Sequence, residues 1–322
     1  SRSKIGEYGI APRSYLFIND GKGKFTEQTE AIIPEFSNLG MLTDATVLEK
    51  AADGSMQEFV VVGEFLPLTI FTKNDDKFVK KELPNSSGWW NCVTAVDMDG
   101  DGDLDFLAGN QGLNADLQPA DNQPIELYVK DFDQNGSSDP ILTYFKQNKK
   151  YTYASKDELI GQIVSLRKRY NDYNSFAQST FSDIFPAEQI SDAIHLRAET
   201  FTSVYVENLG NGEFRIQNLP LSAQVAPLQS FAVTDVNQDG NLDVLSIGNF
   251  YGNQPNLGRA DAAFGDVLLG SGKGDFTVLP AEESGFIVEG DARDVEVLEL
   301  ENGRKLVIIS KNNMSTQVLF IN

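Results

Sequence analysis

The sequence predicts an all-β fold, a β-propeller of four-stranded antiparallel blades, because two sequence patterns recur along it. The hairpin pattern is an apolar strand, a turn rich in Asn and Gly, and then Phe, as in residues 15–25, 204–214 and 267–276. The acidic pattern is a strand, an acidic loop, and an apolar strand that ends in Gly-Asn, as in residues 93–110 and 231–249. Four short strands per unit, repeated every several tens of residues, are typical of propellers.

Weaker copies extend both patterns toward the ends of the chain. Residues 70–78 are a looser hairpin pattern, and residues 45–65 and 295–310 are degenerate acidic patterns. Gly and Asn adopt the positive φ angles that tight hairpins need, and Phe starts the returning strand. We therefore expect residues 1–322 to form a single propeller or part of a larger one.

One segment departs from the β patterns. Ser155 and Glu158 have the spacing of a capping box, in which each side chain satisfies a free N–H at a helix start. Apolar residues then follow at helical spacing, namely Leu159, Ile163, Leu166 and Tyr170. These signals predict a helical insertion near residues 155–192, packed on the β-domain by its apolar side.

Composition excludes several classes of function. The 322 residues contain 26 Lys and Arg against 47 Asp and Glu, a formal net charge of −21, which argues against a nucleic-acid partner. The single Cys and single His exclude a disulfide framework, a Cys-based zinc site and a multi-histidine metal centre. No apolar stretch approaches eighteen residues, so we expect no membrane span.

Three nine-residue loops share the pattern acid-x-acid-x-acid-Gly-x-x-Asp, with Asn allowed at inner positions. Alternate residues direct oxygen side chains toward one point, and Gly at position six permits a sharp turn around it. Such hard oxygen ligands suit Ca²⁺, and an EF-hand is excluded because position twelve is not Glu. The predicted ligands, with position seven acting through its backbone carbonyl, are Asp97, Asp99, Asp101, Asp103 and Asp105; Asp131, Asp133, Asn135, Ser137 and Asp139; and Asp235, Asn237, Asp239, Asn241 and Asp243.

The repetition of these loops predicts about three Ca²⁺ sites. The loops followed by Gly-Asn resemble the FG-GAP/VCBS repeats of integrin-α-like β-propellers. Gly88-Trp-Trp-Asn, residues 109–114, Lys156-Asp-Glu-Leu and residues 248–252 are similar to bacterial VCBS proteins related to the ASPIC/UnbV and cartilage-acidic-protein group. That resemblance implies a secreted or surface-exposed protein with an adhesion or binding role and no established chemistry.

Six residues are candidates for ligand contact. Trp89 and Trp90 are adjacent, so in an alternating strand one ring faces outward, where it could stack on a sugar or pack at a blade edge. The others follow Gly-Asn strand ends, where they either line a binding face or brace loops: Asn110, Asn114, Asn249 and Tyr251.

The sequence favours a calcium-binding extracellular propeller that serves as a protein- or glycan-interaction module. It is not expected to be an enzyme, because most clustered carboxylates are assigned to calcium and His195 is the only histidine. Two alternatives stay open: a structural subunit of a bacterial outer-membrane surface complex that docks through the helical insertion, and a polysaccharide-directed enzyme. Because weak calcium sites fill only at millimolar calcium, we expect an extracellular or bacterial cell-surface, outer-membrane-associated location.

Overall fold

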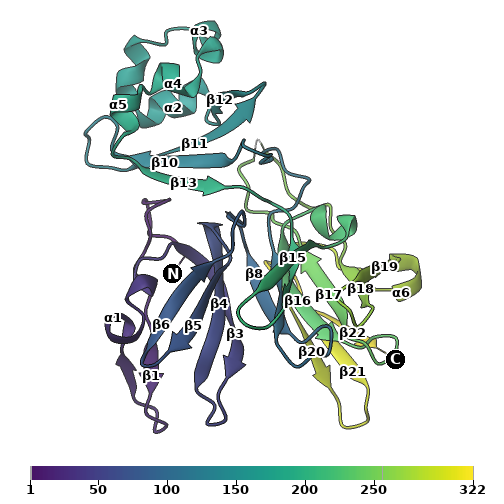
Figure 1. The fold of residues 1–322 in the computed structure, drawn as a ribbon. Helices are drawn as coiled ribbons and strands as arrows, with labels where there is room; N and C mark the ends of the chain where they lie inside the picture. The colour runs from purple at the N-terminus through teal and green to yellow at the C-terminus, as the bar shows by residue number, and fades with distance from the viewer. Residues whose placement is uncertain (1, 256, 322) are drawn as a thin grey trace.

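The computed structural model describes residues 2–255 and 257–321 as a series of antiparallel sheets with a few short helices (Figure 1). The predicted β-rich fold with helix concentrated in one insertion is confirmed. The described residues do not form a closed propeller. None of their helices has the length and apolar character needed to cross a membrane.

The first sheet is a meander whose central strand is buried on both faces. Phe59 and Val61 of this strand pack with Phe71 on one side, and Val60 and Val62 enter a second core on the other. A short strand, β7 (Gly88–Trp89), also pairs with the central strand. The meander is β3 (Met41–Lys50), β4 (Met56–Leu66), β5 (Thr69–Asn74) and β6 (Lys77–Glu82), and before it lie β1 (Phe17–Asn19), β2 (Phe25–Glu27), α1 (Thr29–Ile32) and the 3₁₀ helix η1 (Pro34–Phe36).

The second sheet is completed by strands that are far apart in sequence. Val204 and Val206 lie opposite Ala108 and Phe106, so residues 110–203 are inserted between two neighbouring strands of one sheet. The four strands, in chain order, are β8 (Cys92–Val96), β9 (Asp105–Gly109), β14 (Val204–Asn208) and β15 (Phe214–Asn218).

Two further meanders follow. The third sheet has four strands and the fourth has three. Their elements are η3 (Leu221–Gln224), β16 (Leu228–Thr234), β17 (Asp243–Gly248), β18 (Asp266–Gly270), β19 (Phe276–Leu279), α6 (Ala281–Ser284), β20 (Ala292–Glu299), β21 (Lys305–Lys311) and β22 (Gln317–Ile321).

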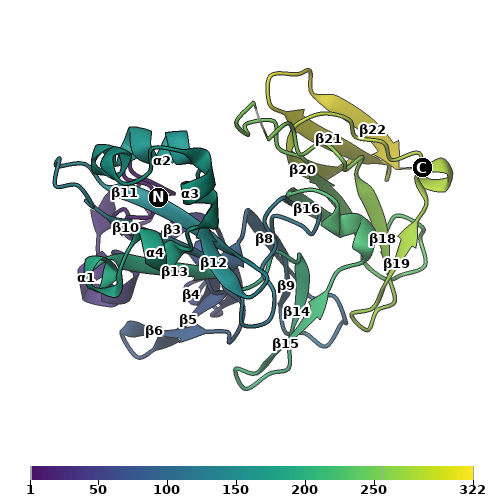
Figure 2. The ribbon, with the colours of Figure 1, turned by 90° about the horizontal axis from the view of Figure 1, so that it is seen from above.

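The first strands of the four meanders pack in series, β3 against β8, β8 against β16, and β16 against β20. Seen from above, the sheets follow one another along an open arc (Figure 2). Polar residues of all four strands, including Asp44, Thr94, Ser230 and Asp294, line a cavity of about 530 Å³.

The inserted unit is a further four-stranded sheet covered on one face by helices, and it stands above the first sheet in Figure 1. It is larger than the predicted helical insertion, because the helices lie between two of its strands. Leu159, Ile163 and Tyr170 are buried against Tyr128 and Ile141 of the sheet, as their spacing predicted. The elements are β10 (Ile125–Lys130), β11 (Asp139–Lys146), β12 (Lys149–Thr152), α2 (Lys156–Gln162), η2 (Val164–Lys168), α3 (Tyr173–Gln178), α4 (Phe181–Ile184), α5 (Ala187–Ile190) and β13 (Ile194–Ala198).

The predicted capping box is present at the start of α2. The Ser155 hydroxyl accepts from the Glu158 N–H at 3.4 Å, and the Glu158 carboxylate accepts from the Ser155 N–H at 2.8 Å. A second capping box, Thr180 with Asp183, starts α4. The segment breaks into several short helices rather than one long helix, so its apolar side can follow the twisted sheet beneath it.

Candidate metal centres

The three acidic loops lie in three different sheets; the first and third follow an edge strand, β8 or β16, and the second joins the two inner strands β10 and β11. Each joins two antiparallel strands, and its ninth residue is the first residue of the returning strand. The register pairs that close the loops are Val96 with Asp105, Lys130 with Asp139, and Thr234 with Asp243. One sequence pattern has therefore produced one type of hairpin loop three times.

The loops also share an unusual backbone conformation. Positions four and six have positive φ in every loop, between 61° and 98°. Position six is always Gly, but position four is Gln in two loops, where the left-handed conformation costs about 1 kcal/mol. Gln adopts this unfavourable conformation at position four of both loops. The other residues of the pattern therefore determine the backbone geometry of the loop. The residues are Gly100 and Gly102, Gln134 and Gly136, and Gln238 and Gly240.

The first aspartate organises each loop from inside. In the first loop, the Asp97 carboxylate accepts from the backbone N–H of Gly100 at 2.8 Å and of Gly102 at 3.2 Å. Equivalent bonds reach Asp131 from Asn135 and Gly136, and reach Asp235 from Gln238 and Gly240.

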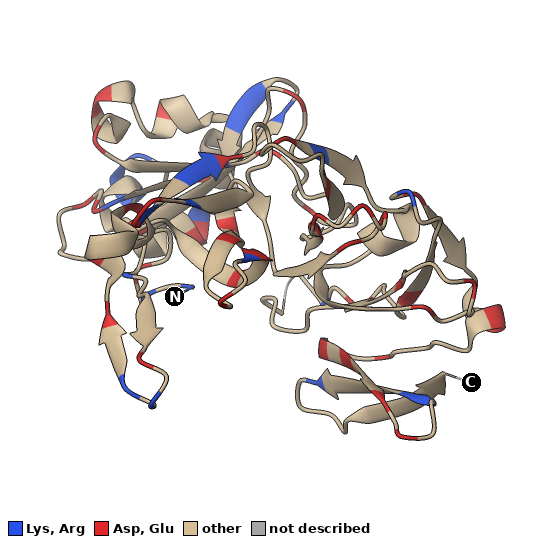
Figure 3. Ribbon diagram, turned by 60° about the horizontal axis from the view of Figure 1, so that its bottom comes forward, with Lys and Arg blue, Asp and Glu red and all other residues tan. Residues whose placement is uncertain are grey.

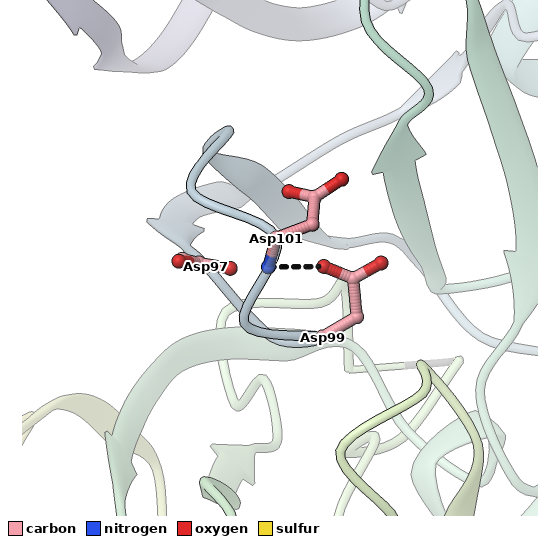
Figure 4. Close-up of side chains that lie close together, drawn as sticks. All are labelled: Asp97, Asp99 and Asp101. Carbon is pink, nitrogen blue, oxygen red and sulfur yellow. Dashed lines mark hydrogen bonds between the residues drawn. The ribbon is translucent and has the colours of Figure 1, made fainter.

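Carboxylates converge in two of the loops. One oxygen from each of Asp97, Asp99 and Asp101 lies within 4.8 Å of the others, and Figure 4 shows the three side chains around one turn. Two like charges 4 Å apart repel by about 4 kcal/mol at an effective dielectric near 20. Such a group is therefore unfavourable without a cation. The second loop gathers Asp131, Asp133 and Asp139 in the same way, whereas the third has an amide, Asn237, at position three.

An unpaired oxygen marks the second loop. The Oδ1 atom of Asp133 is buried and has no hydrogen-bond partner among the described residues. Buried polar atoms almost always have a partner, so an unpaired carboxylate oxygen beside two further carboxylates fits a cation-binding position.

The ninth aspartate is the buried anchor of each loop. Asp105, Asp139 and Asp243 are at most 2% exposed, and each accepts from the N–H of position two at 2.9–3.1 Å. Burial raises the pKa of all three carboxyls, and these hydrogen bonds partly oppose the shift. Each anchor therefore joins the turn to the core of its sheet.

Neighbouring strands complete two of these anchors. Asp105 also accepts from the Tyr205 hydroxyl at 2.6 Å and from the Asn208 N–H at 2.8 Å, and Asp243 accepts from the Gly270 N–H at 2.9 Å. These donors could not be found from the sequence, because the contact depends on which strand pairs with β9 or β17.

Position seven is predicted to act through its carbonyl, and the structure shows that the backbone N–H of the same residue is held in place. In each loop the backbone N–H of position seven donates to the side-chain oxygen of position five at 2.8–2.9 Å. The pairs are Asp103 with Asp101, Ser137 with Asn135, and Asn241 with Asp239.

Three of the six candidate ligand-contact residues are corrected by their burial. Trp90 is fully buried, and its indole N–H donates to the Ser86 carbonyl at 2.9 Å. Asn110 and Asn249 are at most 2% exposed. Asn110 donates to the Thr200 carbonyl at 3.1 Å, so these residues brace the fold instead of facing a ligand.

The other three candidates lie closer to the surface. Trp89 is partly buried, with its ring centroid 4.7 Å from that of Phe201. Asn114 is exposed and donates to the Val225 carbonyl at 3.1 Å. The Arg259 guanidinium lies over the ring of Tyr251, 4.5 Å from the ring centroid.

His195 has structural partners. Its Nε2 lies 2.9 Å from Oε1 of the buried Glu126, its ring stacks on Tyr128 at 4.4 Å, and Lys150 forms an ion pair with the same glutamate. This arrangement holds β10, β12 and β13 together.

No protein-family model matches this chain, and no curated protein is similar to it. The argument for function therefore depends on the loops and their geometry.

Proposed function

We propose that this chain is a calcium-stabilised extracellular module of FG-GAP/VCBS type that binds a protein or glycan ligand and catalyses no reaction. The observation that carries the proposal is the threefold recurrence of one acidic hairpin loop between consecutive antiparallel strands, with positive φ at the same two positions. Carboxylates that lie this close repel one another, and they recur in two of the loops. A cation bound by each loop explains this recurrence best.

Calcium is the cation that the donor chemistry favours. The converging atoms are carboxylate oxygens from side chains of one short loop, and none of the three loops contains a cysteine or a histidine. Ca²⁺ accepts six to eight oxygens in variable geometry, whereas Mg²⁺ demands a tighter octahedron. Sites of this kind fill at extracellular calcium levels, which supports a location outside the cell or on the bacterial surface.

The series of packed first strands supports a propeller-type arrangement. β3, β8, β16 and β20 follow one another as the innermost strands of successive blades do. We therefore take the four meanders as blades of an open propeller and the inserted unit as an addition to the second blade.

The test is a calcium titration of chelator-treated protein by calorimetry, with bound metal counted by elemental analysis. We expect about three equivalents of calcium and a much weaker response to magnesium. Asp99→Ala, Asp133→Ala and Asp239→Ala should each remove about one equivalent. Asp76→Ala, in an exposed hairpin without the pattern, is the matched control and should remove none.

The proposal is wrong if the purified protein binds no calcium. Identical melting curves in chelator and in millimolar calcium would contradict it as well.

A further inference from the structure

The β11–β12 hairpin differs in charge from the rest of this acidic chain. Residues 140–153 contain three lysines and no acidic residue, although the net charge of the chain is −21. Figure 3 shows the lysines and arginines gathered mainly on the side of the molecule that carries the helices, and acidic residues throughout. The hairpin therefore offers a local positive charge to an anionic ligand.

One face of this hairpin combines aromatic rings with lysines. Tyr144 lies opposite Tyr151, and Lys146 lies opposite Lys149. Since alternate residues of a strand share a face, these four side chains and Tyr153 lie on the same side. The Tyr144 ring centroid is 6.3 Å from that of Tyr151 and 6.3 Å from that of Tyr153. All three rings are partly exposed.

A loop beside the hairpin turns this face into a groove of about 550 Å³. Its lining includes Asp116, Gln118, Tyr144, Lys146 and Tyr153, and Tyr151 and Lys149 lie outside it, next to Tyr144 and Lys146 on the same face of the hairpin. The Tyr153 hydroxyl donates to Asp116 at 3.0 Å, which fixes the ring and the carboxylate together.

Both walls of the groove are held in place. The hairpin turns through two residues of positive φ, Gln147 at 50° and Asn148 at 61°, the type I′ geometry of a tight hairpin. Gln123 donates to the Asn148 side chain at 2.7 Å. Asn114 anchors the loop to the Val225 carbonyl. A ligand would thus meet a formed site at little ordering cost.

Neither lysine on this face forms a close ion pair, although Lys149 lies near enough to Asp183 of α4 to help lower the pKa of that carboxyl. In the part of the chain that the structure describes, neither Lys146 nor Lys149 has its ammonium within 4.0 Å of a carboxylate. Lys150, on the opposite face, is paired with Glu126. In a chain of net charge −21, Lys146 and, beside it, Lys149 place ammonium groups next to partly exposed rings, where an outside anion can reach them.

We propose that this groove binds an acidic saccharide, a glycan that carries carboxylate or sulfate groups. The C–H face of a sugar ring would stack on Tyr144 and Tyr151, whose ring faces are electron-rich. Lys146 and Lys149 would bind the acidic substituent, and Asp116 would accept from hydroxyls. This inference rests on the proposed function as an interaction module, for which it names the ligand class.

The experiment is calorimetric titration of the full chain at fixed saturating calcium. The probes are a hyaluronan octasaccharide, dextran sulfate, neutral maltoheptaose, and poly-glutamate as an acidic polymer without sugar rings. We expect an acidic saccharide to bind at least about tenfold more tightly than maltoheptaose and poly-glutamate. Lys146→Gln with Lys149→Gln should lower its affinity about thirtyfold, because each of the two lost charge contacts is worth about 1 kcal/mol.

Matched variants separate the site from general charge and from loss of fold. Lys22→Gln with Lys24→Gln removes the same charge from another exposed hairpin and should change affinity less than about twofold. Tyr144→Phe should retain binding, and Tyr144→Leu should weaken it. The inference is overturned if neither acidic saccharide binds, if poly-glutamate binds as tightly, or if the control variant loses as much. Calcium titration of the same samples is independent, so retained calcium binding without saccharide binding overturns this inference alone.

Discussion

The first and second acidic loops have the same sequence pattern but different support from the protein. In the first, the buried Asp105 accepts three hydrogen bonds, two of them from Tyr205 and Asn208 of the paired strand β14. In the second, Asp139 accepts from the Phe132 N–H and, more weakly, from the Gln162 side chain of α2, and an oxygen of Asp133 is buried without a partner among the described residues. The first loop is held by its own backbone and by two groups of the neighbouring strand β14, whereas the second is held mainly by its own backbone.

This difference teaches that one motif can depend on its ligand to different degrees. Protein donors stabilise a buried carboxylate whether or not a cation is present. Where such donors are fewer, the cation has to supply more of the stabilisation. We therefore expect the first loop to persist without calcium and the second to loosen.

The largest expected effect is on the first loop. Asp105→Ala leaves the Tyr205 hydroxyl and two backbone N–H groups buried without an acceptor, and should cost about 3–5 kcal/mol in the free energy of unfolding. Urea denaturation in chelator measures it. Asp101→Asn is the control: it removes a like charge from the cluster and keeps a side-chain oxygen that can accept from the Asp103 N–H, so in chelator it should leave stability unchanged or raise it. Equal losses in both variants would contradict the assignment of Asp105 as an anchor.

Calcium removal should affect the second loop more than the first. A cation that binds only the folded state adds about 2.7 kcal/mol per site at 100-fold excess over its dissociation constant. Amide hydrogen exchange with and without chelator should show the greater loss of protection at Asn135 and Gly136 than at Gly100 and Gly102. Greater loss in the first loop would reverse the comparison.

The Tyr205 hydroxyl tests one strand contact by itself. Tyr205→Phe removes the 2.6 Å bond to Asp105 and should cost about 2 kcal/mol, because hydrogen bonds to charged groups are worth about 1.5–3 kcal/mol. Thermal unfolding in chelator measures the change. Tyr144→Phe, at a partly exposed ring, should change stability little, and a similar loss there would show that the Asp105 bond is not special.

The smallest effect concerns Tyr153 in the inserted unit. Burial and the bond to Asp116 raise the pKa of Tyr153 to about 12. Because the folded pKa exceeds the ordinary value near 10, the stability it contributes is complete below pH 10 and is lost as the pH rises through 12. Comparing Tyr153→Phe with the parent by denaturation between pH 8 and 12 should show a smaller alkaline loss in the variant. If stability falls equally with pH in the variant and the parent, ionisation of Tyr153 does not contribute to the alkaline loss of stability.

Much of the candidate site could be predicted because its information is local. The oxygens, the Gly of position six and the turn lie within nine residues, so spacing alone gives the loop. The same holds for the capping box of Ser155 and Glu158, whose two hydrogen bonds join residues three apart. Calcium itself stays a prediction.

The tertiary structure alone decided which segments meet. The alternation of residues in a strand indicates which face of the strand is apolar, but it does not indicate which strand pairs with it. The pairing of β9 with β14 across residues 110–203 therefore could not be predicted. The same limit explains Asn110 and Trp90, which follow or precede strands as surface ligand residues would. The bond from Asn110 to Thr200, and the burial of both residues, exist only once segments distant in sequence have packed. Local geometry is fixed by neighbours in sequence, whereas burial and partner choice are fixed by neighbours in space.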